Sequence, residues 1–294
     1  DMGLEVGHSV RSLKDCVNEA KKDITVATNL MEARLLAGDP RLFAAMQKKT
    51  HATSIWPSRK FFAAKWQEQI ERHHHFDDTA YNLEPNVKEG PGGLRDIQMI
   101  AWVTQRHFHA AALHDLVQLE FLSEAEYRAL VRGHNLLAQV RCGLHYLADH
   151  REDRLLFDYQ RSLARIMHYQ DRPGALAVEQ FMKNYYRHVK ELGLLNEILL
   201  QHFQEALLAP GKSKVTAINR RFQARDDFLE VSHNRVFERA PYAMLEMFLL
   251  LQQHPRLKGV RAQTIRLLRA NLHRIDNKFR QDSACRSLFM EILR

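Results

Sequence analysis

The sequence predicts a mostly α-helical protein that begins with a mixed α/β segment. Apolar residues recur at helical spacing over two long stretches, from about 123 to 148 and from about 175 to 208. Residues 24–28 are rich in β-branched side chains, which predicts a strand near the start. The main interruption of the helical pattern is a segment rich in glycine and proline at residues 82–98. The fold class is therefore an α/β segment followed by a helical bundle.

Three zones follow from these patterns. Residues 1–60 form the α/β segment, and residues 61–208 form a helical domain that contains a glycine loop at 88–96. Residues 209–294 form a connector with a short hairpin and further helices. The best candidate linker is 209–214, which combines a proline and a glycine with small and charged residues.

Local signals mark the ends of individual elements. Asp39 and the proline after it predict the start of a helix. Ser123 and Glu126 have the spacing of a capping box at the start of the long helix. Two alternating runs meet at Asp226 and Asp227, which predicts a hairpin, although Asp-Gly is a more favourable turn.

Composition limits the class of protein. The 294 residues are 45% hydrophobic, and no apolar run approaches the roughly 18 residues of a membrane helix, so we expect a cytoplasmic protein without membrane contact. Cys16, Cys142 and Cys285 are too few and too scattered for a disulfide framework. The net charge of +8 suits an anionic partner. Nucleic acid is the disfavoured choice, since amphipathic helices routinely carry Lys and Arg.

The glycine loop is the strongest candidate for a binding site. Residues 82–98 contain three glycines, two prolines, two cations and three carboxylates. Glycine allows close approach of the backbone to a ligand, and Lys88 and Arg95 supply positive charge on both sides, which suits a polyphosphate. Asp96 stands where it can cap the following helix. The alternative is an ordinary turn with a capping aspartate.

This loop resembles one shared by two related enzyme families. A lysine, a Gly-x-Gly-Gly run, a hydrophobic residue and an Arg-acidic pair recur in the same order in the bifunctional uridylyltransferase and uridylyl-removing enzymes of the PII signal protein and in the glutamine synthetase adenylyltransferases. Residues 4–11 and 23–39 resemble the uridylyltransferase branch specifically, and the similarity continues at 153–158 and 221–223. In this chain the loop motif consists of Lys88, Gly90, Gly92, Gly93, Leu94, Arg95 and Asp96.

The resemblance implies an enzymatic role. It implies transfer of UMP from UTP to a tyrosine of the PII signal protein, with Mg²⁺ as cofactor and with glutamine as an effector that acts through domains outside this chain. Residues 1–60 would be the end of a nucleotidyltransferase domain. The acidic-x-acidic metal pair of that superfamily does not occur before residue 70, so we expect it upstream of residue 1 and expect this chain alone to be inactive.

The resemblance also assigns roles to individual residues. Glu32 would be the catalytic carboxylate that holds magnesium, with Asp23 as the fallback metal ligand. Otherwise Glu32 is a solvated helix residue that pairs with Arg34, and Asp23 is a turn or cap residue. His8 can equally be a structural histidine. The residues implied to contact the nucleotide are Gly7, His8, Ser9, Arg11, Lys88, Gly92, Gly93, Arg95 and Asp96.

Three further alternatives are weighed against this interpretation. The consecutive histidines at 73–75 suggest a metal site, but adjacent residues on a helix point in different directions, so a solvated helix end is favoured. An adenylyltransferase of glutamine synthetase is the second enzyme candidate. A noncatalytic helical module that docks a protein partner is the candidate from a different class.

Overall fold

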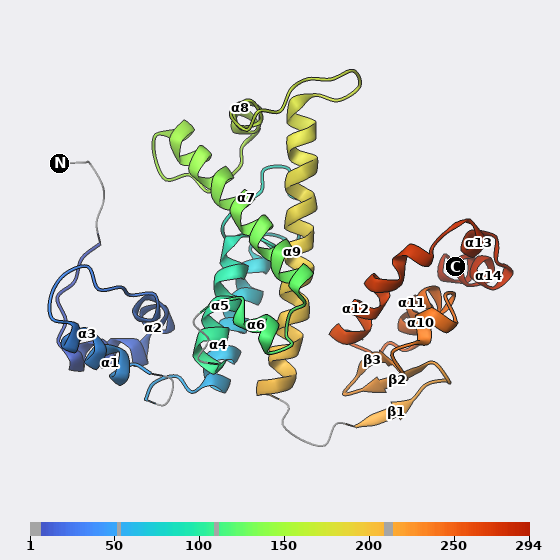
Figure 1. The fold of residues 1–294 in the computed structure, drawn as a ribbon, viewed down its shortest axis with the longest axis horizontal. Helices are drawn as coiled ribbons and strands as arrows, with labels where there is room; N and C mark the ends of the chain where they lie inside the picture. Colours follow the sequence, from blue (N-terminus) through green and yellow to red (C-terminus); the bar gives the residue numbers. More distant parts are fainter. Residues whose placement is uncertain (1–6, 52–53, 109–111, 209–213) are drawn as a thin grey trace. The chain divides into compact units, whose positions relative to one another are not determined.

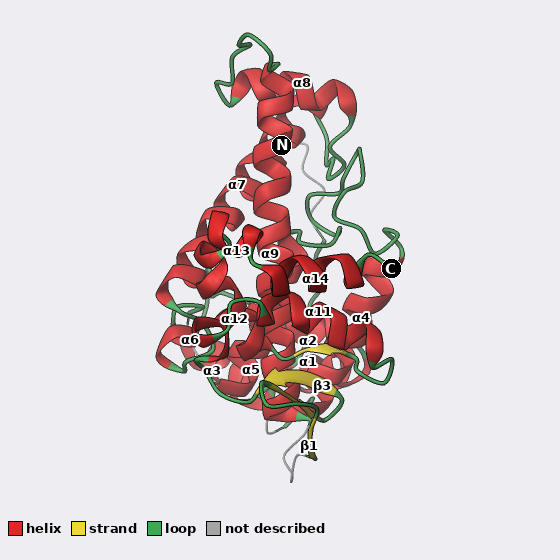
Figure 2. Ribbon diagram, turned by 90° about the vertical axis from the view of Figure 1, so that its right-hand side faces the viewer, coloured by secondary structure: helices red, strands yellow, loops and turns green. Residues whose placement is uncertain are grey.

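A computed structural model describes residues 7–51, 54–108, 112–208 and 214–294. Helices make up most of the described chain, which confirms the prediction of a mostly α-helical protein (Figure 2). None of the helices in these described ranges combines the length and the apolar character that crossing a membrane requires. The chain divides into two compact units, Asp1–Phe203 and Gln204–Arg294, which are described separately below.

The first unit begins with three helices around a small core. A capping box starts the first of them, because the Ser12 hydroxyl accepts from the Asp15 N–H and the Asp15 carboxylate accepts from the Ser12 N–H. Ala20 and Ala27 are buried between the first two helices, and the indole N–H of Trp56 donates to the Ala20 carbonyl at 2.7 Å. The helices are α1 (Leu13–Lys22), α2 (Ile24–Met31) and α3 (Pro40–Lys49).

The prediction of a strand at residues 24–28 is wrong, because this stretch lies in α2. The Asp23 carboxylate accepts from the Thr25 N–H at 2.7 Å and caps the helix. Ala27 and Thr28 are buried on the side that packs against α1 and Trp56. The β-branched residues favour a strand only weakly, and tertiary packing of the helix outweighs that preference.

Four long helices of the first unit, α4, α5, α7 and α9, run alongside one another (Figure 1). The predicted capping box at Ser123 and Glu126 is confirmed, as are both long predicted helices. The ring of Phe203 on α9 lies 6.2 Å from that of Phe62 on α4 and 6.0 Å from that of Phe108 on α5. The helices are α4 (Ser58–His74), α5 (Leu94–Phe108), α6 (Asp115–Gln118), α7 (Glu124–Ala148), α8 (Phe157–Ile166) and α9 (Ala177–Leu207).

The second unit contains a four-stranded sheet in the order β1-β2-β3-β4, in which the last pair is parallel. The predicted hairpin is confirmed: Asp226 and Asp227, at φ 52° and 66°, join β2 to β3 with the left-handed backbone of a type I′ turn. Phe222, Leu229 and Phe237 are fully buried in its core. Most of the predicted linker lies outside the described residues. The strands are β1 (Val215–Ala217), β2 (Phe222–Arg225), β3 (Phe228–Val231) and β4 (Gly259–Val260).

Helices complete the second unit after the hairpin. The further helices predicted in this connector are present, and the longest of them are α11, α12 and α14. The elements are α10 (Val236–Arg239), α11 (Ala243–Gln253), α12 (Ala262–Asn271), a 3-10 turn (Leu272–Arg274), α13 (Asn277–Gln281) and α14 (Ser283–Ile292).

Candidate functional site

The loop before α5 is fixed by its own backbone and by a neighbouring segment. The Asn86 side-chain oxygen accepts from the N–H groups of Lys88 at 3.0 Å and Glu89 at 2.8 Å. The Arg95 N–H donates to the Lys88 carbonyl at 2.8 Å, and the Val87 N–H donates to the Asp153 carbonyl at 2.9 Å. The loop therefore holds its charged side chains on a defined scaffold.

Gly92 is required by packing against α9. Its φ of 74° lies in the left-handed region, and an added Cβ would stand 2.4 Å from the Val189 carbonyl oxygen. The obstacle is helix backbone, which cannot rotate away as a side-chain tip can. Gly93 is similarly confined, since a Cβ there would lie 2.8 Å from the Lys88 carbonyl oxygen. The sequence suggested close approach to a ligand, and the structure supplies an approach between two parts of the same chain.

We therefore expect Gly92→Ala to destabilise the protein by about 2 kcal/mol, from the positive φ together with the clash. Gly174→Ala is the matched control, because Gly174 has φ 79° and nothing within 4 Å of an added Cβ. It should cost no more than about 1 kcal/mol. Urea unfolding of both variants measures the difference. Equal losses would show that the contact with α9 does not constrain the loop.

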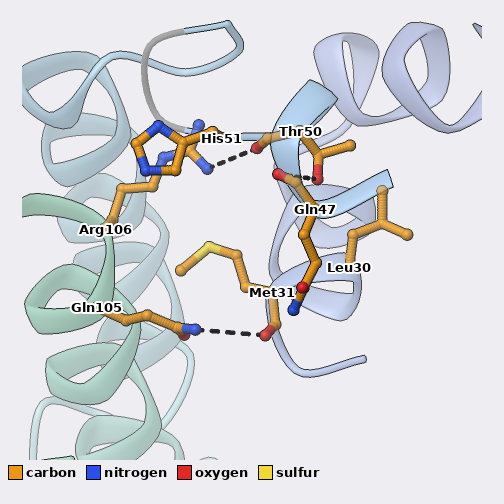
Figure 3. A pocket seen from close by; sticks show the side chains of 7 residues that line it. All are labelled: Leu30, Met31, Gln47, Thr50, His51, Gln105 and Arg106. Atoms are coloured by element: carbon orange, nitrogen blue, oxygen red, sulfur yellow. Dashed lines mark hydrogen bonds between the residues drawn. The ribbon is translucent and has the colours of Figure 1, made fainter. Parts of the chain in front are cut away.

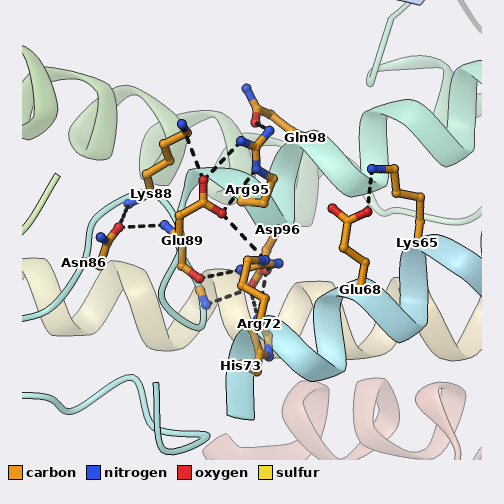
Figure 4. Close-up of polar contacts among 11 residues, drawn as sticks. Lys65, Glu68, Arg72, His73, Asn86, Lys88, Glu89, Arg95, Asp96 and Gln98 are labelled. Carbon is orange, nitrogen blue, oxygen red and sulfur yellow. Dashed lines mark hydrogen bonds and ion pairs between the residues drawn. The ribbon is translucent and has the colours of Figure 1, made fainter. Parts of the chain in front are cut away.

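Glu89 is the acceptor at the centre of the cationic cluster (Figure 4). Arg95 donates to it through Nη2 at 3.1 Å and through Nε at 3.4 Å. The Lys88 ammonium lies 3.4 Å from the same carboxylate, and the Arg72 Nε lies 3.9 Å from it. In this arrangement Glu89 occupies the position between Lys88 and Arg95 that an anionic ligand would otherwise take.

The charges around Glu89 set its protonation. Burial alone would raise the pKa of Glu89, but the hydrogen bond from Arg95 and the positive charges of Arg95, Lys88 and Arg72 outweigh it and hold the pKa below its ordinary value. The Asp153 carboxylate, which accepts from Arg141 at 2.6 Å, also has a lowered pKa despite its burial. Both groups are therefore ionised in the folded protein at neutral pH.

The lowered pKa of Glu89 predicts an acid-dependent loss of stability. Because the folded-state pKa is below the unfolded one, the stabilisation is present above the unfolded pKa and is lost as the pH falls through the folded pKa. We expect the free energy of unfolding to fall as the pH drops below the ordinary glutamate pKa of about 4.5, and part of that fall to disappear in Glu89→Gln. Urea unfolding at each pH measures this slope. Glu19→Gln, which alters an exposed pair with Lys22, is the control, and equal slopes in the two variants would contradict the prediction.

Asp96 connects the loop to α4. Its carboxylate is almost fully buried and accepts from the Gly92 N–H at 2.8 Å, from the Arg72 Nη2 at 2.5 Å and from the His73 Nε2 at 2.9 Å. Asp96 is not the N-cap that the sequence suggested, because α5 already begins at Leu94; from the first turn of α5 its carboxylate ties Gly92 and α4 together. His73 departs from the predicted solvated helix end, since its ring faces this carboxylate, whereas His74 is exposed.

Trp102 joins Glu32 to the cationic loop. Its indole N–H donates to the Glu32 Oε1 at 2.8 Å, although the two residues are 70 positions apart. On the same ring, the Arg95 guanidinium lies 5.4 Å and the Lys65 ammonium 4.7 Å from the centroid. Glu32 is itself exposed. The structure therefore brings two of the predicted site residues, Glu32 and Arg95, to one tryptophan.

Asp23 and Glu32 are separated by α2. Asp23 caps its start and Glu32 its end, which places them roughly 13 Å apart by the rise of an α-helix. They cannot share one metal ion, so they remain alternatives as ligands. In the described part of the chain, no three His, Cys, Asp or Glu side chains gather as a metal site. The predicted nucleotide contacts Gly7, His8, Ser9 and Arg11 lie in an exposed segment without helix or strand before α1.

Three partners of the site escaped the sequence analysis: Glu89, Arg72 and Trp102. Glu89 lies inside the loop, and its position between two cations was the one available signal. Arg72 and Trp102 lie outside the loop motif and carry no signal of their own, so only the fold brings them to the loop.

The fold and the site define a class of protein: a helical unit that presents a rigid, cation-rich glycine loop beside an exposed carboxylate. The chain belongs to the GlnD PII-uridylyltransferase family. The profile of that family matches residues 60–200, and that of the third domain of uridylyltransferase GlnD matches residues 222–294. This confirms the resemblance drawn from the sequence.

Individual relatives are similar over the whole chain. Proteins named bifunctional uridylyltransferase/uridylyl-removing enzyme are 55% identical in Nitrosococcus oceani and 50% identical in Pseudomonas aeruginosa and Azotobacter vinelandii, with 100% of this chain covered in each. The chain spans 33% of the length of these relatives. No solved structure matches it.

Proposed function

We propose that this chain forms part of a PII uridylyltransferase, which transfers UMP from UTP to a tyrosine of the PII signal protein in the cytoplasm, in response to glutamine sensed by other domains. The observation that carries the proposal is 55% identity over the full chain to a protein named bifunctional uridylyltransferase/uridylyl-removing enzyme. The contact of Glu32 and Arg95 with one tryptophan supports it, because both residues must reach the same nucleotide.

The cationic loop would bind the triphosphate. Arg95 can present two parallel N–H donors to phosphate oxygens, and Lys88 adds a point charge beside it. In the described structure both cations face Glu89. A bound phosphate would therefore either share the two cations with the Glu89 carboxylate or displace it from them. Arg72 would then keep Glu89 charged and in place while Arg95 turns to the ligand.

Glu32 would hold Mg²⁺ together with further ligands that the residues named here do not supply. The residue fits that role, because carboxylate oxygen is the donor that magnesium prefers and Glu32 is exposed while Trp102 fixes one of its oxygens. Bound magnesium supplies positive charge to the reacting phosphates. Trp102 orients the carboxylate, and Arg95 holds the phosphate chain toward it.

The experiment is a transfer assay on a full-length enzyme that contains this sequence, with labelled UTP, Mg²⁺ and purified PII protein. We expect label on a PII tyrosine, and no label when that tyrosine is replaced by phenylalanine. ATP with glutamine synthetase as acceptor tests the adenylyltransferase alternative. Transfer to glutamine synthetase, or no transfer to either acceptor, would overturn the proposal.

A further inference from the structure

A second candidate site lies between α2, α3 and α5, away from the glycine loop. A cavity of about 160 Å³ is lined there by Met31, Gln47, Thr50, Gln105 and Arg106, among others. Figure 3 shows the Arg106 side chain extending from α5 toward Thr50 at the end of α3, with Gln47 and Met31 on the facing wall.

Arg106 is a buried cation whose hydrogen bonds are incomplete. It is 4% exposed, and its Nε and Nη1 donate to the carbonyls of Trp56 at 3.1 Å and Thr50 at 3.2 Å. Its Nη2 is buried and has no hydrogen-bond partner among the described residues. Both neighbours are neutral carbonyls, and the ring of Phe61 lies 5.4 Å from the guanidinium.

A buried guanidinium without a carboxylate is costly, because the charge loses its hydration and gains no counter-charge. Burial lowers the pKa of Arg106 to about 10, and no anionic group among the described residues acts to raise it. Among the ion pairs found in residues 7–51, 54–108, 112–208 and 214–294, none includes Arg106. The fold thus holds an uncompensated positive charge and a spare N–H donor beside a cavity.

We propose that this cavity binds a small oxyanion, with Arg106 as its anchor. The planar guanidinium suits phosphate and carboxylate oxygens, and the Gln47 and Gln105 amides on the cavity wall can donate to the same anion. The cavity accepts a group of the size of inorganic phosphate, not a whole nucleotide. This inference does not rest on the proposed function, since none of the loop residues lines the cavity.

The test measures the thermal unfolding midpoint of the 294-residue chain in sodium phosphate, sodium acetate and sodium chloride at matched ionic strength. Phosphate or acetate should raise the midpoint above chloride in a saturable way, and the more effective salt identifies the anion as phosphate or carboxylate. Arg106→Gln should weaken the apparent affinity at least about tenfold. Arg128→Gln, which changes an exposed arginine on α7, should leave it unchanged.

A second variant covers the case in which Arg106→Gln fails to fold. Gln47→Glu leaves both backbone contacts of Arg106 intact and adds a carboxylate to the cavity wall. It should abolish the salt-specific gain, because the new charge repels the anion or pairs with Arg106. An equal response of the wild-type unfolding midpoint to all three salts would overturn the proposal. So would a salt-specific rise of the midpoint that persists in Gln47→Glu or in a folded Arg106→Gln.

Discussion

Replacing Glu32 by Gln is expected to lower UMP transfer by about a hundred- to a thousandfold in a full-length enzyme that contains this sequence. The amide oxygen of Gln can still accept from the Trp102 indole N–H, which lies 2.8 Å from the carboxylate, so the local structure should persist. What is lost is the negative charge that would hold magnesium. The effect should therefore appear in transfer rate and in magnesium dependence.

Two controls separate the catalytic role of Glu32 from a structural one. Glu32→Gln should change the free energy of unfolding by less than about 0.5 kcal/mol. Glu19→Gln removes an exposed carboxylate on α1 and should leave transfer unchanged. Normal transfer in Glu32→Gln at saturating magnesium would exclude Glu32 as a ligand.

Arg95→Lys is expected to reduce the UTP-dependent rate by roughly ten- to a hundredfold. This is the effect on rate of losing one charge-assisted hydrogen bond. Lysine keeps the charge but cannot present two donors in one plane to a phosphate. It also loses the hydrogen bond that Arg95 makes to Gln98 at 2.7 Å, so we expect a further cost of about 1 kcal/mol in stability. UTP kinetics and urea unfolding on the same variant measure both effects, with Arg154→Lys, an exposed arginine near Glu84, as control.

Glu89→Gln distinguishes a phosphate clamp from a structural ion pair. If Lys88 and Arg95 bind phosphate, removal of the competing carboxylate should tighten UTP affinity. If the cluster only stabilises the loop, Glu89→Gln and Arg95→Lys should both leave UTP kinetics unchanged, whatever they do to the unfolding midpoint. The second pattern would contradict the proposed role of the loop.

Local signals in the sequence were sufficient to predict several elements of the fold. The Ser123 and Glu126 capping box defined the start of α7, because capping depends on residues three positions apart. Asp226 and Asp227 defined the hairpin, since aspartate tolerates the left-handed backbone that the turn requires. The prediction of a strand at residues 24–28 was wrong because these residues form a helix that is stabilised by burial against α1. A local sequence pattern does not contain that information.

The candidate site was only partly predictable, for the same reason. Resemblance singled out Glu32 and Arg95, whereas their common partner Trp102 is 70 residues from Glu32 and lies outside the loop motif. Glycine content suggested ligand contact, yet the position of Gly92 against Val189 gives it a packing role that depends on α9. Long-range partners are set by how helices pack, which the sequence pattern does not contain.

A crystal structure of a full-length enzyme containing this sequence, bound to a nonhydrolysable UTP analogue and Mg²⁺, would show whether the loop and Glu32 serve one nucleotide site. We expect phosphate oxygens within hydrogen-bond distance of Arg95 and Lys88, and a magnesium ion on the Glu32 oxygen that Trp102 leaves free. A nucleotide bound elsewhere, with Arg95 still paired to Glu89 and no metal at Glu32, would contradict this expectation.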